Sequence, residues 1–232
     1  MREQDLIEIE FMEQQQHGLH REILEFILST LWLGIAFGVA FSGGYNAFKN
    51  PADLKITVLQ SVIVVFFAFV LHELAHRLVA RRYGHKATYR MWMPGLLLAL
   101  GGSLFGMIFA TPGGVHVDID LTAPDAKSKL GKTALAGPVT NIVLCVIMAI
   151  TAIFVLASIN INEITPLMKF IVGTLVIGIE INAWLAVFNL LPVGNFDGLK
   201  VFYWNKVVWT ITFVLSIAIF AGILWLQAVF LK

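Results

Sequence analysis

The 232-residue chain is 58% hydrophobic before its 19 glycines are counted, is only 13% charged, and has a mean hydropathy of +0.82. Soluble domains have roughly 45–50% apolar residues with glycine included, and about twice this share of charged residues. A water-soluble globule is therefore excluded. The net charge of +1, without a basic tract, argues against a nucleic-acid partner, and the single cysteine, Cys145, excludes a disulfide within the chain.

Long uncharged stretches separate the charged residues, as in a membrane protein with several spans. A helix needs about 20 apolar residues to cross the hydrocarbon. Five stretches fit this requirement: residues 26–48, 56–71 with its continuation to Arg77, 133–162, 170–191 and 207–231. We predict an all-α polytopic membrane protein with about six hydrophobic segments and five or six transmembrane helices, forming one domain over residues 1–232.

The sixth apolar segment, residues 91–115, has a different character because glycine and proline interrupt it. The interruptions are Pro94-Gly95, Gly101-Gly102, Gly106 and Pro112-Gly113-Gly114. Irregular backbone is tolerated at membrane depth only where protein or water covers it. We therefore expect a hairpin or re-entrant element at 91–120, ending in an alternating strand at 115–120.

The distribution of basic residues predicts the orientation in the membrane. If the N-terminus is cytoplasmic and 91–115 does not cross, four basic residues lie outside: Lys49, Lys55, Lys169 and Lys232. The other twelve then face the cytoplasm, as the positive-inside rule favours. The first 25 residues hold seven acidic and two basic side chains, unlike a cleaved signal peptide. Apolar residues within 6–12 are expected to form a short interfacial helix.

The segment from His72 to His76 has the pattern His-Glu-x-x-His. On a helix, residues i and i+4 share a face, so both imidazoles can reach one tetrahedral Zn²⁺. Glu73 lies beside them, where it can hold and deprotonate a water at the metal. With six histidines and nine glutamates in the chain, chance gives roughly 0.006 occurrences of the pattern. Ionisable groups within an apolar helix are usually functional, so we favour a zinc site over an amphipathic helix end.

A catalytic zinc site usually has three protein ligands, so one more is required. Asp197 is the favoured candidate because Pro192 and Gly194 end the preceding span, which places Asp197 on the same side and at a similar depth as His72. Glu180 lies about nine residues deeper, roughly 13 Å along a helix, and would miss the metal. The remaining candidates are Glu163, His116, Asp118 and Asp120.

These motifs resemble those of the site-2 protease family of intramembrane zinc metalloproteases. The resemblance covers roughly residues 56–200, as the catalytic core, and rests on four segments: His72–His76, Ala136-Gly137-Pro138, Asn189-x-x-Pro192-x-x-x-x-Asp197-Gly198 and Pro112-Gly113-Gly114-Val115. It implies one zinc ion per chain, with these site residues: His72, His76 and Asp197 as ligands, Glu73 as catalytic base, and Asn189 positioning substrate backbone or the oxyanion.

The resemblance further implies a metalloendopeptidase that hydrolyses peptide bonds in or near transmembrane segments of membrane proteins, as in regulated intramembrane proteolysis. Its partners would be a transmembrane substrate and the lipid bilayer, and its active site would lie near the cytoplasmic face. The 113–120 strand would clamp an unwound substrate by strand addition. The sequence carries no PDZ or CBS module, in contrast to many relatives.

Two other functions remain open. In one, a membrane zinc protease pairs the His-Glu-x-x-His helix with a distal glutamate in a soluble chamber, but Glu163 and Glu180 fit neither the side nor the depth. In the other, a non-proteolytic metal-binding transporter or regulator uses the buried histidines. That function leaves Glu73 and the segment from Asn189 to Asp197 unexplained.

Weaker polar signals lie outside these motifs. Glu180 is expected to hydrogen-bond within the bundle rather than to form a polar gate. Asn141, one turn after Pro138, is a further candidate for positioning substrate or the oxyanion. It either supports the site or ties two helices together, and both interpretations stand equal. The group His116, Asp118 and Asp120 is interpreted as a solvated strand edge rather than a second metal site.

Overall fold

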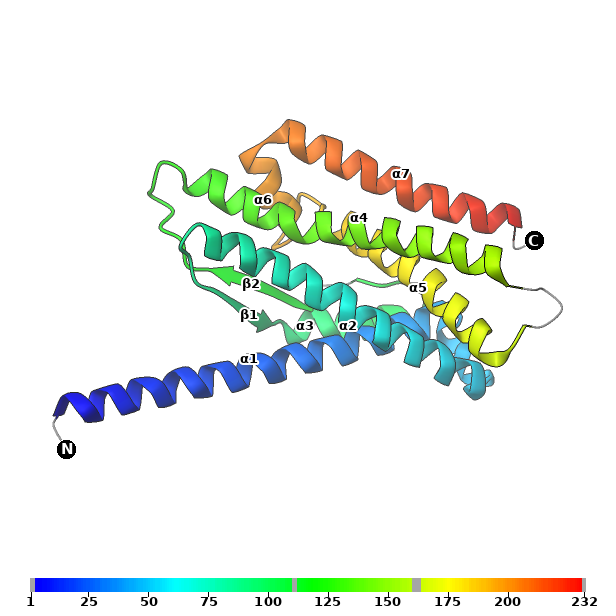
Figure 1. The fold of residues 1–232 in the computed structure, drawn as a ribbon, viewed down its shortest axis with the longest axis horizontal. Helices are drawn as coiled ribbons and strands as arrows, with labels where there is room; N and C mark the ends of the chain where they lie inside the picture. Colours follow the sequence, from blue (N-terminus) through cyan, green and yellow to red (C-terminus); the bar gives the residue numbers. More distant parts are fainter. Residues whose placement is uncertain (1–2, 110–111, 160–163, 231–232) are drawn as a thin grey trace.

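The computed structural model describes residues 3–109, 112–159 and 164–230, with side chains described between Gly18 and Val229 (Figure 1). The elements in chain order are α1 (Glu3–Phe41), η1 (Gly44–Lys49), α2 (Pro51–Arg82), β1 (Ala87–Met91), α3 (Met93–Ser103), β2 (Gly113–Val117), α4 (Ala126–Ser158), α5 (Pro166–Asn189), α6 (Asp197–Trp204) and α7 (Lys206–Phe230).

Within the described residues, five helices are long and apolar enough to cross a membrane. They are Gly18–Phe41 of α1, α2, α4, α5 and Lys206–Val229 of α7. Their lipid-side faces carry many exposed aliphatic and aromatic side chains, as a bilayer environment allows. The predicted fold class, an all-α polytopic membrane protein with a small β element, is confirmed.

The helix α1 packs closely against α2 in its second half. A Cβ atom added to Gly34 would lie only 2.7 Å from the Cα atom of Val62, and Gly38 is equally close to Val58. Small residues four apart let two helix backbones approach each other, and this contact drives helix association in lipid. The glycine pair therefore fixes where α1 crosses α2.

The helix α1 is longer at its N-terminal end than the sequence suggests. It is one continuous helix from Glu3 to Phe41, and its first half projects beyond the rest of the bundle (Figure 1). The prediction of a separate interfacial helix over residues 6–12 is therefore wrong. Those residues form the first turns of α1, which continue into the first span.

The β element is a two-stranded antiparallel sheet beside one end of α2 (Figure 1). Its strands β1 and β2 are joined through α3, and the pair is called the hairpin below. Its strand β2 covers Gly113–Val117, so the predicted strand at 115–120 is displaced by about two residues, and the partner strand β1 was not predicted. Strand β2 ends early because Asp120 turns the chain, its carboxylate accepting hydrogen bonds from Thr122 N (2.9 Å) and Oγ1 (2.6 Å).

Among its described residues the segment 91–115 has no helix long enough to span a membrane, as expected, but it contains a short apolar helix, α3. Pro94 falls in the first turn of α3, where a missing N–H and a fixed φ are favourable for a helix rather than disruptive. Its glycine pair lies near the C-terminal end, where Gly102 packs against the backbone of Met107. Breaker residues at helix ends are therefore compatible with an 11-residue helix.

The helices α2, α4 and α5 form the centre, and α7 covers α5 from outside. Helix α7 is held by a hydrogen bond from Trp209 Nε1 to Leu190 O (2.8 Å) at one end. Near the other end, Gln227 donates to the Glu180 carboxylate. The bundle interior thus hydrogen-bonds Glu180, in agreement with the favoured interpretation of this residue.

The contact between α1 and α2 gives a test of the packing. Gly34→Leu should lower the free energy of unfolding by about 1–3 kcal/mol, since the new side chain overlaps the backbone of Val62. The measurement is the melting temperature of the purified protein in detergent. Gly222→Leu in α7 is the matched control, because no atom lies within 4 Å of a Cβ there; an equal loss in both variants would contradict the packing argument.

Candidate active site

The His-Glu-x-x-His segment lies in the last three turns of α2, with its polar side chains turned into the bundle. His72, Glu73 and His76 are 4%, 6% and 4% exposed, respectively. The two imidazole rings lie one turn apart with their centroids 4.7 Å from each other. Their Nε2 atoms are 3.0 Å apart, so both nitrogens point to a single place beside the helix.

Asp197, the first residue of α6, brings a carboxylate to that place. Its Oδ2 atom lies 3.0 Å from His76 Nε2 and 3.4 Å from His72 Nε2, and its side chain is 12% exposed. The ligand atoms of the three residues all lie within 4.8 Å of one another. Two imidazoles and one carboxylate are a donor set that suits a catalytic zinc ion.

The second oxygen of Asp197 is held by a lysine. Lys200, one turn further along α6, donates from Nζ to Asp197 Oδ1 at 3.2 Å. Burial alone would raise the pKa of Asp197, but His76 and Lys200 hold this pKa well below its usual range. Asp197 is therefore a carboxylate, the form in which it can bind a cation.

The outer nitrogens of both histidines are fixed by α4. Asn141 Oδ1 lies 2.5 Å from His72 Nδ1, and the carbonyl oxygen of Thr133 lies 2.7 Å from His76 Nδ1. An acceptor at Nδ1 keeps the proton on that nitrogen and leaves Nε2 as a lone-pair donor, which is how ligating histidines are oriented in metal sites. Asn141 also donates to Asn182 Oδ1 of α5 (3.0 Å). It therefore contacts His72 and also connects α4 to α5.

Gly137 of α4 makes room for the imidazoles. A Cβ atom at this position would overlap Nε2 of both His72 and His76. Glycine is thus required where α4 passes the site, which gives the glycine of Ala136-Gly137-Pro138 a physical reason. A larger side chain at position 137 would fill the space beside the Nε2 atoms of both histidines.

Glu73 lies beside the three candidate ligands with one oxygen unused. Its Oε2 atom is buried and has no hydrogen-bond partner among the described residues. A cavity of about 20 Å³ adjoins it, with this lining: Phe69, His72, Glu73, Pro112, Gly113, Leu185 and Asn189. A polar cavity of roughly 10–15 Å³ or more can hold one water molecule, so the site has room for one water between Glu73, Gly113 and Asn189.

The other candidates from the sequence lie elsewhere. Within the described residues, only His72, His76 and Asp197 form a group that could hold a metal, so a second metal site at His116, Asp118 and Asp120 is not formed. Glu180 pairs with Gln227 instead, and Glu163 falls outside the described residues. Asn189 reaches the cavity wall and donates to Leu185 O (3.0 Å).

Comparison with known proteins places this site in a family. The sequence profile of peptidase family M50 matches residues 60–223. The chain belongs to peptidase family M50. A relative from Methanocaldococcus jannaschii, named as a zinc metalloprotease, is 37% identical over 193 residues, which are 82% of this chain and 88% of the relative. No solved structure matches the chain.

M50 is the family of the site-2 proteases, so the resemblance seen in the sequence is confirmed. This M50 peptidase is a zinc-dependent metalloprotease and an integral membrane protein. The arrangement of its residues suits zinc: three donor atoms converge, Gly137 leaves space, and the orphaned oxygen of Glu73 adjoins a cavity of the size of one water.

Several contacts of this site have no signal in the sequence. The backbone carbonyl of Thr133 carries no side-chain pattern, and Lys200 resembles any other interfacial lysine. Spacing alone offers one clue to Lys200, since a residue three positions after Asp197 shares its helix face.

The assignment of Asp197 as a ligand can be tested by metal content. Asp197→Asn should lower the zinc bound per purified chain by tenfold or more at limiting free zinc, because a neutral amide is a far weaker donor than a carboxylate. Inductively coupled plasma mass spectrometry gives the zinc-to-protein ratio. Asp125→Asn is the control, since Asp125 pairs with Lys129 outside the site. Unchanged zinc in Asp197→Asn would reject this ligand.

Proposed function

We propose that this M50 peptidase cleaves peptide bonds in or near transmembrane segments of membrane proteins. The observation that carries the proposal is the position of the site. His72, Glu73 and His76 are buried in a helix long and apolar enough to span the membrane, between other such helices. A site among membrane-spanning helices suits a substrate that is itself embedded in the bilayer.

Each proposed role follows from the position of one group. His72, His76 and Asp197 hold the zinc ion, which when bound supplies a Lewis acid that polarises the scissile carbonyl and acidifies water. Glu73 Oε2 takes a proton from the attacking water and passes it to the leaving amine. Asn189 lies across the same small cavity, where its amide can donate to substrate backbone or to the developing oxyanion.

The hairpin offers a place for the substrate backbone. Two backbone hydrogen bonds flank the paired strands: Asp118 N donates to Lys86 O (2.9 Å), and Trp92 N donates to Pro112 O (2.8 Å). Thr88 pairs with His116, and Arg90 pairs with Gly114. Because hydrogen-bonded and non-hydrogen-bonded pairs alternate in antiparallel sheets, these even-numbered residues form the backbone hydrogen bonds between β1 and β2.

The odd-numbered residues of β2, Gly113 and Val115 among them, therefore direct their backbone groups to the other edge. That edge faces the site: Gly113 lines the cavity with Glu73, and the amide of Val115 lies beside the Glu73 carboxylate. A substrate helix must unwind before its carbonyl can be attacked, and its freed backbone groups then need partners. Strand addition to β2 supplies them next to the catalytic base.

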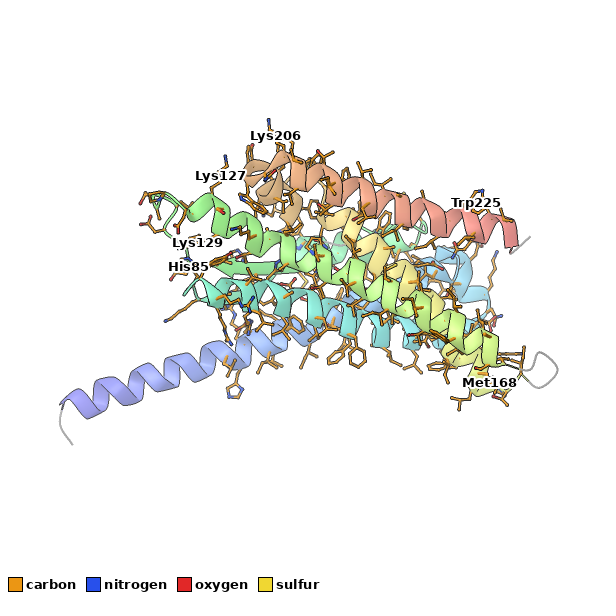
Figure 2. The ribbon with its side chains drawn as sticks, turned by 45° about the horizontal axis from the view of Figure 1, so that its top comes forward. His85, Lys127, Lys129, Met168, Lys206 and Trp225 are labelled. Carbon is orange, nitrogen blue, oxygen red and sulfur yellow. The ribbon has the colours of Figure 1, made fainter. Side chains whose placement is uncertain are left out.

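We further propose a cytoplasmic N-terminus and an active site near the cytoplasmic face. Figure 2 shows Lys127, Lys129 and Lys206 at one end of the bundle together with His85, and Met168 and Trp225 at the other. Lys127, Lys129 and Lys206 belong to the larger basic group that the positive-inside rule assigns to the cytoplasm. The hairpin and α6 lie at the same end (Figure 1).

The role of Glu73 separates a protease from a metal carrier. Glu73→Gln should retain zinc and lose cleavage of a single-span membrane substrate by at least 10³-fold, since an amide cannot take the proton. The assay uses purified zinc-loaded protein in lipid vesicles, read by gel, with a chelator-treated wild-type sample alongside. Glu180→Gln, which keeps its hydrogen-bonding partner Gln227, is the matched control. Cleavage by Glu73→Gln at the wild-type rate would show that Glu73 is not the base.

The orientation can be read by cysteine labelling. In a Cys145→Ala background, Lys169→Cys should react with a membrane-impermeant thiol reagent on intact cells, whereas Lys127→Cys should react only after permeabilisation. Lys127 is exposed at the start of α4, and Lys169 is exposed at the start of α5, at the opposite end of the bundle. Cys145 is buried. Labelling of Lys127→Cys on intact cells would reverse the proposed orientation.

A further inference from the structure

The outer edge of β1 is covered by two carboxylates of α1. Glu22 Oε1 accepts a hydrogen bond from Tyr89 N at 2.8 Å, and Glu25 Oε2 accepts one from Met91 N at 3.0 Å. Tyr89 and Met91 are the odd-numbered residues whose backbone groups point away from β2. The two glutamates therefore occupy the positions that a neighbouring strand would take.

Each carboxylate also pairs with an arginine, at the same oxygen in Glu22 and at the other oxygen in Glu25. Arg77 of α2 donates to Glu22, and Arg21 Nε donates to Glu25 Oε1 at 2.7 Å. Both glutamate side chains are only 12% exposed. A buried carboxylate is stable only when its oxygens are hydrogen-bonded or paired, and here each one bonds both a strand amide and an arginine.

Tyr89 joins the same helix through its side chain. It is 0% exposed, its hydroxyl donates to Ser29 Oγ (2.8 Å), and its ring packs edge-on against Phe26 with the centroids 5.2 Å apart. The hydroxyl also reaches Pro112 O at the start of β2 (3.1 Å). Backbone and side-chain contacts together attach the hairpin to α1.

We propose that Glu22 and Glu25 are positioning residues that close the β1 edge and hold the hairpin with the β2 edge at Glu73. The sheet then accepts a third strand on one side only, the side of the catalytic base. The proposal rests on strand addition as part of the proposed function. It assigns a role to α1, which lies outside the segment 60–223 that defines the family match.

The kinetic constants distinguish this role from simple stabilisation of the fold. A displaced β2 edge weakens the binding of the extended substrate, so it raises KM while the ligands and Glu73 keep their geometry. A general loss of folded protein instead lowers the apparent kcat and the zinc content together and leaves KM unchanged. The glutamates do not touch His72, His76 or Asp197, so zinc content should not change.

The experiment compares Glu25→Ala and Glu25→Gln with the wild-type holoenzyme in lipid vesicles, using one single-span substrate. Glu25→Ala should raise KM about five- to tenfold with kcat changed less than about twofold, a loss in the range of one ordinary hydrogen bond. Glu25→Gln keeps an oxygen acceptor for Met91 N, so its KM should rise less. Hydrogen–deuterium exchange of the segment 87–91 should be faster in Glu25→Ala.

A matched control is Asp53→Asn, which removes a carboxylate charge near the start of α2, where Asp53 bonds Asn50 away from the hairpin. Its KM should equal that of the wild type. If Glu25→Ala does not fold, a KM rise in Glu25→Gln with full zinc supports the proposal, and a wild-type KM in that variant overturns it. If the wild-type enzyme cleaves the substrate and both Glu25 variants have its KM, the positioning role alone is overturned. Absence of cleavage by the wild-type holoenzyme would instead overturn the proposed function and this role together.

Discussion

The structure depends on one convergence: two imidazoles from α2 and one carboxylate from α6 direct their donor atoms to a single point inside the bundle. His72 and His76 reach that point from one helix face, which the i, i+4 spacing secures by itself. Asp197 reaches it only if α5 ends at the right depth and the chain turns back, with Asp197 Oδ2 3.0 Å from His76 Nε2. Polar groups this close are stable in an apolar interior only when each has a partner, so the surrounding helices must supply those partners.

Helix α4 supplies most of them, and its sequence shows the constraint. Within two and a half turns it contributes the Thr133 carbonyl to His76, the missing side chain of Gly137, and Asn141 to His72. The chain of amides continues from Asn141 to Asn182, which donates to the Gly178 carbonyl of its own helix at 2.8 Å. A shift of α4 by one residue would break all of these contacts at once. The polar network thus fixes the register of the central helices, while the apolar surface only keeps them in the membrane.

The sequence predicts what local periodicity controls, and the remaining features arise from contacts between distant segments. The spans follow from uncharged stretches, and the histidine pair follows from helical spacing. Asp197 could be chosen as the third ligand because Pro192 and Gly194 end the preceding span and so fix its depth in the membrane. Nothing in the local sequence specifies the direction of its side chain. The hairpin was predicted only in part, since β1 is a short segment whose pairing is set by residues 22 to 30 positions along the chain. The role of Glu22 and Glu25 could not be predicted at all, because their partners are backbone amides more than 60 residues away.

The hairpin also shows why an irregular element belongs beside this site. Within the described residues the sheet has two strands, and an open strand edge among membrane helices leaves backbone donors and acceptors without partners, which is costly unless protein or water covers them. On the β1 side, carboxylates of α1 cover the edge. On the β2 side, Gly113 faces a cavity with room for one water next to the unused oxygen of Glu73. Hydrolysis needs water at the same position. In the proposed mechanism, the cavity beside the open edge of β2 would also hold the water that Glu73 activates, and a substrate strand added to this edge would bring its carbonyl next to that water.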